Sequence, residues 1–356
     1  LFCFPLLVLT TRVVPSYFSL MGHSGPQLAL ESEYASYLIL GVIFLVLRNA
    51  LSGFFLGIGR TRVVMVSNVL AMFVNIPLNY LLIFGNFGFP ELGIAGAAIG
   101  TIGGSASAFF VLLIAYLSRR IHREFGTRRR PVFERAMFLR LLRFGSPAGF
   151  ELFLNVLAFN VFIQLMHSYG PDVAAATTIT FNYDIVAFVP MLGLGVATTA
   201  VVGQYIGAED IEGARKTTYL SLRLAFVYAG TMMVTFIVAA APLVAVFASG
   251  PAGGEDVTRL AETLLRLAGL YTLADATQLV FAGALRGAGD TSWVMRASVV
   301  LHWVFAGVVI LLIRVLGVGP LVVWLSFIIF IASMGLTMFL RFRAGKWTKM
   351  SVIEKK

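Results

Sequence analysis

A single acidic residue stands out in the stretch LADATQLVFAGALRGAGDT, residues 273 to 291, because Asp275 lies inside an otherwise apolar segment. Tyr271 precedes it by four residues, so on a helix the carboxylate and the phenol share one face. A charge at membrane depth is costly and is expected to face a partner, water or the interior of a bundle. An anionic oxygen beside a phenol can bind a proton or a small cation. The structural alternative is that Asp275 forms an ion pair that holds the bundle together.

A second polar pair occurs in GSPAGFELFLNVLAFN, where Glu151 and Asn155 are one helical turn apart. On one face of a helix, these two side chains could complete a polar site with Asp275. The alternative for Glu151 is interfacial, because it lies only about two turns from the predicted helix start at Phe144 and its side chain could extend to the membrane surface.

Amide side chains form a third candidate site in VNIPLNYLLIFGNFGFPELGIAGAAIGT. Asn75 and Asn79 lie at i and i+4 around Pro77, which frees a backbone carbonyl, so the two amides could satisfy that carbonyl or coordinate a cation. Thr101 follows on the next predicted helix. That helix also carries glycines at four-residue spacing, which predict close helix packing before any function: Gly96, Gly100 and Gly104.

Asp184, in FNYDIVAFVPMLG, is a further acid in an apolar segment, with no obvious partner, and is a candidate for lining a substrate cavity. Several basic residues in apolar segments are better explained as interfacial or ion-paired than as substrate ligands: Arg12, Arg48, Arg223, Arg314 and His302.

Enzymatic signatures are weak. The sequence GHSG at 22–25 resembles the Gly-x-Ser-Gly of an intramembrane serine protease, but its glycines and the following proline are typical of a turn. No phosphate-binding Gly-x-x-x-x-Gly-Lys-Ser/Thr occurs, and one cysteine and four scattered histidines offer no metal-ligand spacing. We therefore expect no enzyme, and no cofactor other than a transported coupling ion.

The composition places these residues in a membrane protein, since 59% of the 356 residues are hydrophobic, 12% are charged and the mean hydropathy is +0.90. Apolar runs bounded by Gly, Pro or charge predict an all-α polytopic chain of ten helices. Their approximate ranges are 1–22, 34–58, 62–85, 92–118, 144–168, 173–202, 215–248, 260–283, 292–316 and 320–342.

Connections rich in Lys and Arg alternate along the chain with connections that lack them, and the net charge of the chain is +10. The linker 119–143 and the tail 343–356 are strongly basic, whereas the connections 22–33, 85–91, 169–172 and 249–257 carry acidic residues and no Lys or Arg. The positive-inside rule therefore predicts that the linker and the C-terminus are cytoplasmic. A patch for nucleic acid or anionic lipid is the less favoured reading of the linker.

An internal repeat is visible in GFFLGIGRT (53–61) and GALRGAGDT (283–291), which share Gly-x-x-x-Gly-x-Gly-x-Thr at an offset of 230 residues. Two parallel lobes are expected, 1–118 and 144–342, joined by the linker. Since 144 minus 230 is −86, we expect that the chain is N-terminally truncated and holds ten of twelve helices, the last four of six in the N-lobe. Four glycines of these turns are candidate cytoplasmic hinges: Gly57, Gly59, Gly287 and Gly289.

Three stretches make the sequence similar to the multidrug and toxic compound extrusion (MATE) family, in its NorM-type branch: VNIPLNYLLIFGNFGFPELGIAGAA, FVPMLGLGVATTAVVGQYIGAED and YTLADATQLVFAGALRGAGD. The resemblance implies a two-lobed bundle of twelve helices and an antiporter in which Na+ or H+ runs inward while an organic, often cationic, drug is expelled. It implies a multi-pass protein of the plasma or inner membrane, a monomer, with no nucleic-acid partner.

The resemblance also implies roles for residues. Asp275 falls on the cation-site aspartate of the second lobe and Tyr271 on its aromatic neighbour, whereas Asn75, Asn79 and Thr101 fall on the cation site of the first lobe. The seventh family helix carries an acid where this chain has Asn155, with Glu151 one turn earlier. This departure leaves the coupling ion, and the role of Glu151, open. The alternative function is a flippase for a lipid-linked or polyprenyl substrate, which would need an arginine-lined cavity.

Overall fold

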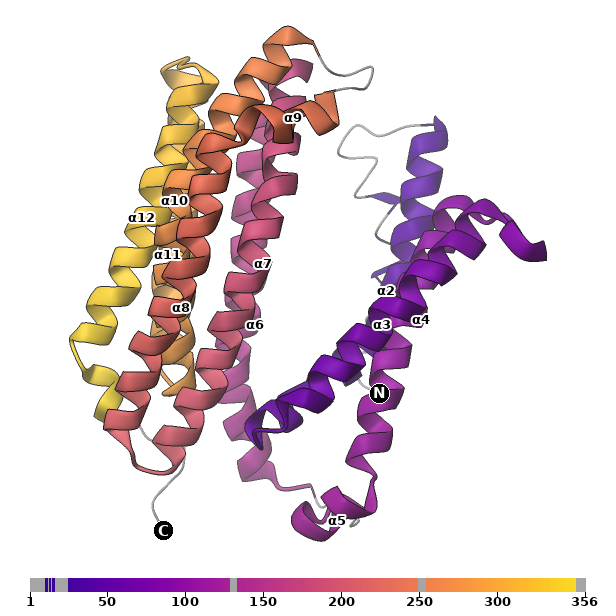
Figure 1. Ribbon diagram of the computed structural model, residues 1–356, viewed down its shortest axis with the longest axis vertical. Coiled ribbons are helices and arrows are strands. Elements are labelled where there is room, and N and C mark those ends of the chain that lie inside the picture. The colour runs from indigo at the N-terminus through magenta and orange to yellow at the C-terminus, as the bar shows by residue number, and fades with distance from the viewer. Residues whose placement is uncertain are drawn as a thin grey trace. The chain divides into compact units, whose positions relative to one another are not determined.

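The computed structural model describes residues 25–128, 133–248 and 254–349, together with residues 10, 11, 13, 15 and 16. Within these residues the secondary structure is helical, and no strand occurs (Figure 1). Eight helices are long and apolar enough to cross a membrane. The predicted all-α polytopic class is therefore confirmed. Most of the predicted helix 1–22 and residues 22–24 of GHSG lie outside the described residues.

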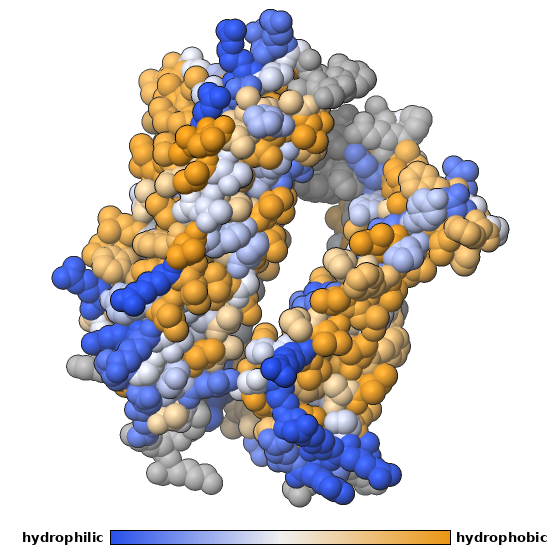
Figure 2. Space-filling view, in the orientation of Figure 1, coloured by the Kyte–Doolittle hydropathy of each residue, from blue (hydrophilic) through white to orange (hydrophobic). Residues whose placement is uncertain are grey.

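The chain divides into two compact units, residues 1–132 and 133–356, which are described separately. In unit 1, the helices pack as α2 and α3 against α4. Figure 2 shows hydrophobic residues over the middle of these helices and hydrophilic residues at the end that carries α5. The elements are α2 (Gly25–Gly57), α3 (Thr61–Phe84), η1 (Asn86–Gly88), α4 (Gly93–Tyr116) and α5 (Arg119–Phe125).

The glycines of α4 let it approach α3 closely. A Cβ on Gly96 would lie 2.4 Å from the carbonyl oxygen of Leu82, and one on Gly100 would lie 2.1 Å from Oδ1 of Asn79. The backbone of α4 thus lies directly against the backbone of α3 at Gly96 and against the Asn79 side chain at Gly100, the close packing that glycines at four-residue spacing predict.

Unit 2 is built around α10, whose neighbours include α7, α8 and α12. This helix has the most buried residues in the described part of the chain. It is not among the eight candidate spans, because the polar residues that it carries lower its hydropathy. A helix enclosed by other helices does not need an apolar surface toward lipid.

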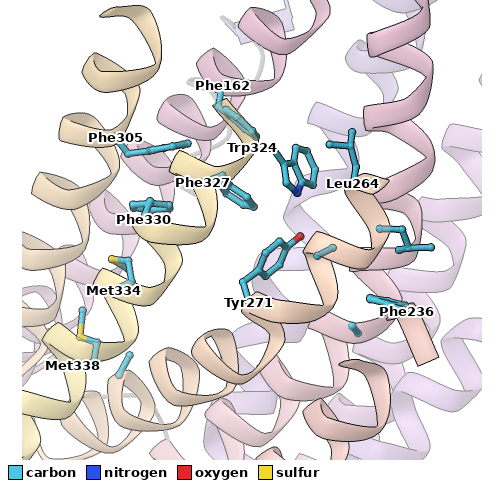
Figure 3. Packing of buried hydrophobic residues seen from close by; sticks show 14 of the residues in the cluster. Phe162, Phe236, Leu264, Tyr271, Phe305, Trp324, Phe327, Phe330, Met334 and Met338 are labelled. Carbon is cyan, nitrogen blue, oxygen red and sulfur yellow. The ribbon is translucent and has the colours of Figure 1, made fainter. Parts of the chain in front are cut away.

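The elements of unit 2 are α6 (Arg135–His167), α7 (Pro171–Gly207), α8 (Ile211–Val238), α9 (Ala240–Ala248), α10 (Glu255–Gly287), α11 (Thr291–Ile310), η2 (Leu311–Val315), α12 (Pro320–Arg343) and η3 (Lys346–Lys349). An aromatic cluster fills the space between α6, α7, α11 and α12 (Figure 3). Phe162 and Phe327 stack at its centre with ring centroids 5.0 Å apart.

The predicted helix bounds were wrong by the largest amounts in three places. Helix α2 begins at Gly25 instead of near 34, and α6 begins at Arg135, inside the predicted linker. Charged residues ended both segments in the hydropathy reading, but a helix can carry charges where it leaves the apolar layer. The predicted helix 215–248 breaks at Ala239, three residues before Pro242, because proline cannot donate the backbone bond that would continue α8.

The two glycine turns have the same backbone structure. Helices α2 and α10 are both 33 residues long and their bounds differ by 230. Gly59 and Gly289 have φ angles of 74° and 92°, and the amide after each donates to the carbonyl five residues before it, at 2.8 Å and 2.9 Å. These are Schellman-type helix ends, in which glycine supplies the left-handed residue.

Candidate functional site

The candidate site of unit 2 joins two helices through a hydrogen bond between side chains. The hydroxyl of Tyr271 on α10 donates to Oδ1 of Asp184 on α7 at 2.9 Å. Asp275 follows Tyr271 by one turn on α10, and the charges of Asp184 and Asp275 are close enough to act on each other. The sequence suggested no partner for Asp184, and the structure shows that it accepts a hydrogen bond from Tyr271.

Asp275 is 4% exposed, and its carboxylate makes no hydrogen bond or ion pair with any residue that the structure describes. Twelve residues separate it from the end of α10 at Gly287, which is about 18 Å along the axis, or roughly half of a hydrocarbon core. A buried carboxylate without a donor is unfavourable, so the site favours a cation or a proton as its missing partner.

The ring of Tyr271 is fixed by packing. It is 1% exposed and meets the ring of Phe327 on α12 edge to face, with centroids 5.3 Å apart. Figure 3 shows Tyr271 extending from α10 toward Trp324 and Phe327. The phenol oxygen is thus held at the junction of α7, α10 and α12, where it can serve as a hydrogen-bond donor or a cation ligand.

Glu151 has another partner. It is 4% exposed, and its Oε1 accepts from Nη2 of Arg286 on α10 at 2.6 Å. Glu151 is therefore buried and paired with an arginine near the end of α10, and no hydrogen bond or ion pair between described residues joins it to Asp275. The sequence placed Arg286 on the basic side without assigning it a partner.

Asn155, predicted beside Glu151 in the site, donates from Nδ2 to Oγ of Ser298 on α11 at 2.8 Å. The carbonyl oxygen of Ser298 in turn bonds to Nδ1 of His302 at 2.8 Å. No hydrogen bond between described residues joins Asn155 to Asp275. The polar residues of α6 thus face α11 and the end of α10.

The amides of unit 1 are adjacent, as their spacing predicts, with Nδ2 of Asn79 donating to Oδ1 of Asn75 at 3.4 Å. Oδ1 of Asn79 is buried without a partner among the described residues. Thr101 donates to the carbonyl oxygen of Ala97 on its own helix, at 2.9 Å. A cation site formed by these three residues stays a prediction.

Two of the four predicted hinge glycines, Gly59 and Gly289, have the left-handed turn conformation described above. Gly287 has a packing role, since a Cβ there would lie 2.5 Å from the carbonyl oxygen of Thr199 on α7. Gly57 ends α2 and has no atom within 4 Å of an added Cβ. The second turn is also fixed by an ion pair at 2.7 Å between Asp290 and Arg341 of α12.

Comparison with known proteins identifies relatives of this chain. A family model described as MatE matches residues 1–81 and 147–312. The chain is 29% identical over 318 residues to the multidrug resistance protein MdtK of Photorhabdus laumondii, covering 86% of this chain and 66% of that protein. It is 26% identical over 307 residues to a probable multidrug resistance protein NorM of Bacillus cereus, covering 85% and 66%. The chain thus spans just under two thirds of these relatives.

Solved structures show the same fold at 20% identity. A MATE family transporter of the MOP superfamily in an outward-facing conformation matches with a TM-score of 0.81, covering 98% of this chain and 78% of that one. An inward-facing structure matches at 0.69, covering 97% and 78%. A MOP superfamily transporter from Pyrococcus furiosus, described as having a binding pocket of reverse polarity, matches at 0.85, covering 97% and 76%. The helical architecture and the family match agree, and this chain belongs to the MatE family.

Proposed function

We propose that the protein is an antiporter that exports organic, often cationic, compounds by alternating access and is driven by Na+ or H+. The observation that carries the proposal is the buried carboxylate of Asp275, which lacks a partner among the described residues and lies beside the Asp184–Tyr271 hydrogen bond. Two relatives are named as multidrug resistance proteins, and solved relatives of the same fold are described as outward-facing and inward-facing. These names support export and alternating access.

Coupling follows from charge. When a cation or proton neutralises Asp275, the packing of α10 against α7 no longer buries an unpaired charge, so the two ionic states favour different helix arrangements. A cationic substrate is attracted by the same acids and competes with the coupling ion. Because linkage is reciprocal, each ligand lowers the affinity for the other by the same factor.

Gradient-driven export tests the proposal. In vesicles or drug-sensitive cells, Asp275→Asn is expected to lower ethidium export by at least about tenfold, because a neutral amide removes the charged interaction with the coupling ion. The matched control is Asp256→Asn, the same change on an exposed residue in the first turn of the same helix. Unchanged export in Asp275→Asn rules out coupling through this residue.

The choice between Na+ and H+ needs separate gradients. At fixed pH, an inward Na+ gradient is expected to accelerate export if Na+ is the coupling ion. Export that responds to a proton gradient and ignores Na+ excludes the Na+ form of the proposal.

The flippase alternative requires free arginines for an anionic head group. In unit 2, Arg286 is paired with Glu151 and Arg341 with Asp290. Arg48 on α2 differs, because its Nε is buried without a hydrogen-bond partner in the described part of the chain. A loss of lipid-linked substrate binding in Arg48→Gln, with no loss of ethidium export, would favour the flippase.

A further inference from the structure

We infer that Asp184, on α7, supplies the second carboxylate of a Na+ site whose other ligands are Asp275 and Tyr271. This inference rests on the proposed cation coupling and adds the ion and a ligand to it. It differs from the sequence prediction, which placed the second polar ligands on α6 and placed Asp184 in a substrate cavity.

The geometry points to Asp184 through its hydrogen bond to the α10 site, whereas the polar groups of α6 are directed to other partners, except that Oδ1 of Asn155 is buried without a partner among the described residues. Glu151 holds Arg286 at 2.6 Å, and Asn155 donates to Ser298 at 2.8 Å. Asp184, in contrast, is joined to the α10 site by the 2.9 Å hydrogen bond from Tyr271. The second acid close enough to act on Asp275 through its charge therefore comes from α7.

The hydrogen bonds at the site favour a cation over a proton shared between the two carboxylates. A proton shared by two carboxylates needs their oxygens about 2.5 to 2.7 Å apart. No hydrogen bond joins Asp275 to Asp184 or Tyr271 in the described structure, which argues against a proton shared between the two carboxylates. A cation of the size of Ca2+ holds each oxygen at about 2.3 to 2.6 Å, which separates oxygens on opposite sides by up to about 5 Å. Na+ has this size and the same preference for oxygen.

The negative charges of the two carboxylates explain what a bound cation would do at this site. Two neighbouring carboxylates repel each other, and here Asp275 is buried, Asp184 is partly buried, and α7 packs closely on α10, since a Cβ on Gly283 would lie 2.4 Å from the carbonyl oxygen of Gly195. A monovalent cation between the carboxylates offsets this repulsion and gives Asp275 the partner that it lacks. Within the described residues, no group of three or more His, Cys, Asp or Glu could hold a metal ion, so the site depends on two carboxylates and the phenol of Tyr271.

Equilibrium binding of radioactive Na+ to the purified full-length protein, without drug, tests the inference. Asp184→Asn and Asp275→Asn are each expected to weaken Na+ binding by at least about tenfold, because each removes a charged ligand. The controls Asp172→Asn and Asp256→Asn make the same change at exposed residues in the first turns of α7 and α10, and are expected to keep the affinity.

Thermal unfolding distinguishes a ligand from a structural residue and identifies misfolded variants. Without Na+, Asp184→Asn is expected to raise Tm, because it removes repulsion between like charges, and to abolish the rise in Tm that Na+ produces in the unaltered protein. A residue with only a structural role would lower Tm and leave the Na+ response intact.

Three results would overturn the inference: no saturable Na+ binding by the unaltered protein, normal Na+ affinity in Asp184→Asn, or loss of affinity in Asn155→Ala with retention in Asp184→Asn. Failure of this inference can be told apart from failure of the proposed export. If Asp184→Asn keeps gradient-driven export, the antiporter proposal is retained and the Na+ site is rejected. If both acids are needed for Na+ binding but the protein exports no drug, the Na+ site is retained and the antiporter proposal is rejected.

Discussion

At the scale of single residues, the hydroxyl of Tyr271 provides the observed link between the polar residues of α7 and α10. The phenol is on the same face of α10 as Asp275, yet it donates to Asp184 across the helix interface. Sequence periodicity compares residues within one helix, so it related Tyr271 to Asp275 and gave no information about α7. The partner of Asp184 was accordingly missed.

Replacing only the hydroxyl tests this bond. Tyr271→Phe is expected to weaken Na+ binding by at least about tenfold, because it removes a ligand and a hydrogen bond to a charged carboxylate, and to keep the ring contact with Phe327. The matched control is Tyr183→Phe, because Tyr183 precedes Asp184 on α7 and its hydroxyl donates away from the site, to Leu243 at 2.6 Å. Equal loss in both variants would show a general packing effect.

The Glu151–Arg286 pair is expected to stabilise the fold and not to bind the coupling ion. Glu151→Gln should lower the free energy of unfolding by about 1 to 3 kcal/mol, between the values of exposed and buried pairs, and leave Na+ affinity unchanged. Adding Arg286→Gln should restore part of the loss, because no buried charge then remains unpaired. Denaturant titration measures the first effect. A tenfold loss of Na+ affinity in Glu151→Gln would instead place this residue in the site.

At the scale of elements, glycines determine how closely α7 and α10 approach. Oγ1 of Thr199 donates to the carbonyl oxygen of Gly283 at 3.0 Å, a contact between a side chain and the backbone of another helix. Gly287 continues this contact toward the basic end. The close interface fixes the relative height of Asp184 and Tyr271, so it positions the site as well as stabilising the pair of helices.

Gly283→Ala is expected to destabilise unit 2 by about 1 to 3 kcal/mol, because the added Cβ would lie 2.4 Å from the carbonyl oxygen of Gly195 and would push the helices apart. Gly307→Ala on α11 has no atom within 4 Å of the added Cβ and should be neutral or stabilising by up to about 1 kcal/mol, since alanine favours helix. Thermal unfolding in one detergent compares the two. The same sign at both positions would contradict the packing argument.

At the scale of the molecule, the charge pattern predicts which side of the membrane each connection faces. Glu255 begins α10 on the side predicted to be external, and Lys216 lies near the start of α8 on the basic side. In a background with Cys3→Ser, a membrane-impermeant thiol reagent is expected to label Glu255→Cys in intact cells. It should label Lys216→Cys only after permeabilisation, because that residue is cytoplasmic under the positive-inside rule. Labelling of both in intact cells would reject the topology.

The sequence alone determined the membrane class, the internal repeat and the candidate acids. Hydropathy and glycine spacing are local properties, because each pattern is contained within about one helix of the sequence. The repeat was predictable because both turns need glycine in the left-handed conformation, at Gly59 and Gly289, which few other residues adopt. The helix starts at Gly25 and Arg135 were missed, because charge marks the edge of the apolar layer and not the end of a helix.

Only the tertiary structure decided which side chains meet. Helices α6, α7, α10 and α11 are distant in sequence, and the pairs Glu151–Arg286, Asn155–Ser298 and Asp184–Tyr271 each join two of them. Such pairs depend on helix rotation and height, which close glycine packing sets and which the sequence of one helix does not contain. The sequence therefore identified Asp275 as a candidate functional acid, and the packing of α7 against α10 brought Asp184 to the hydroxyl of Tyr271, one turn away on α10.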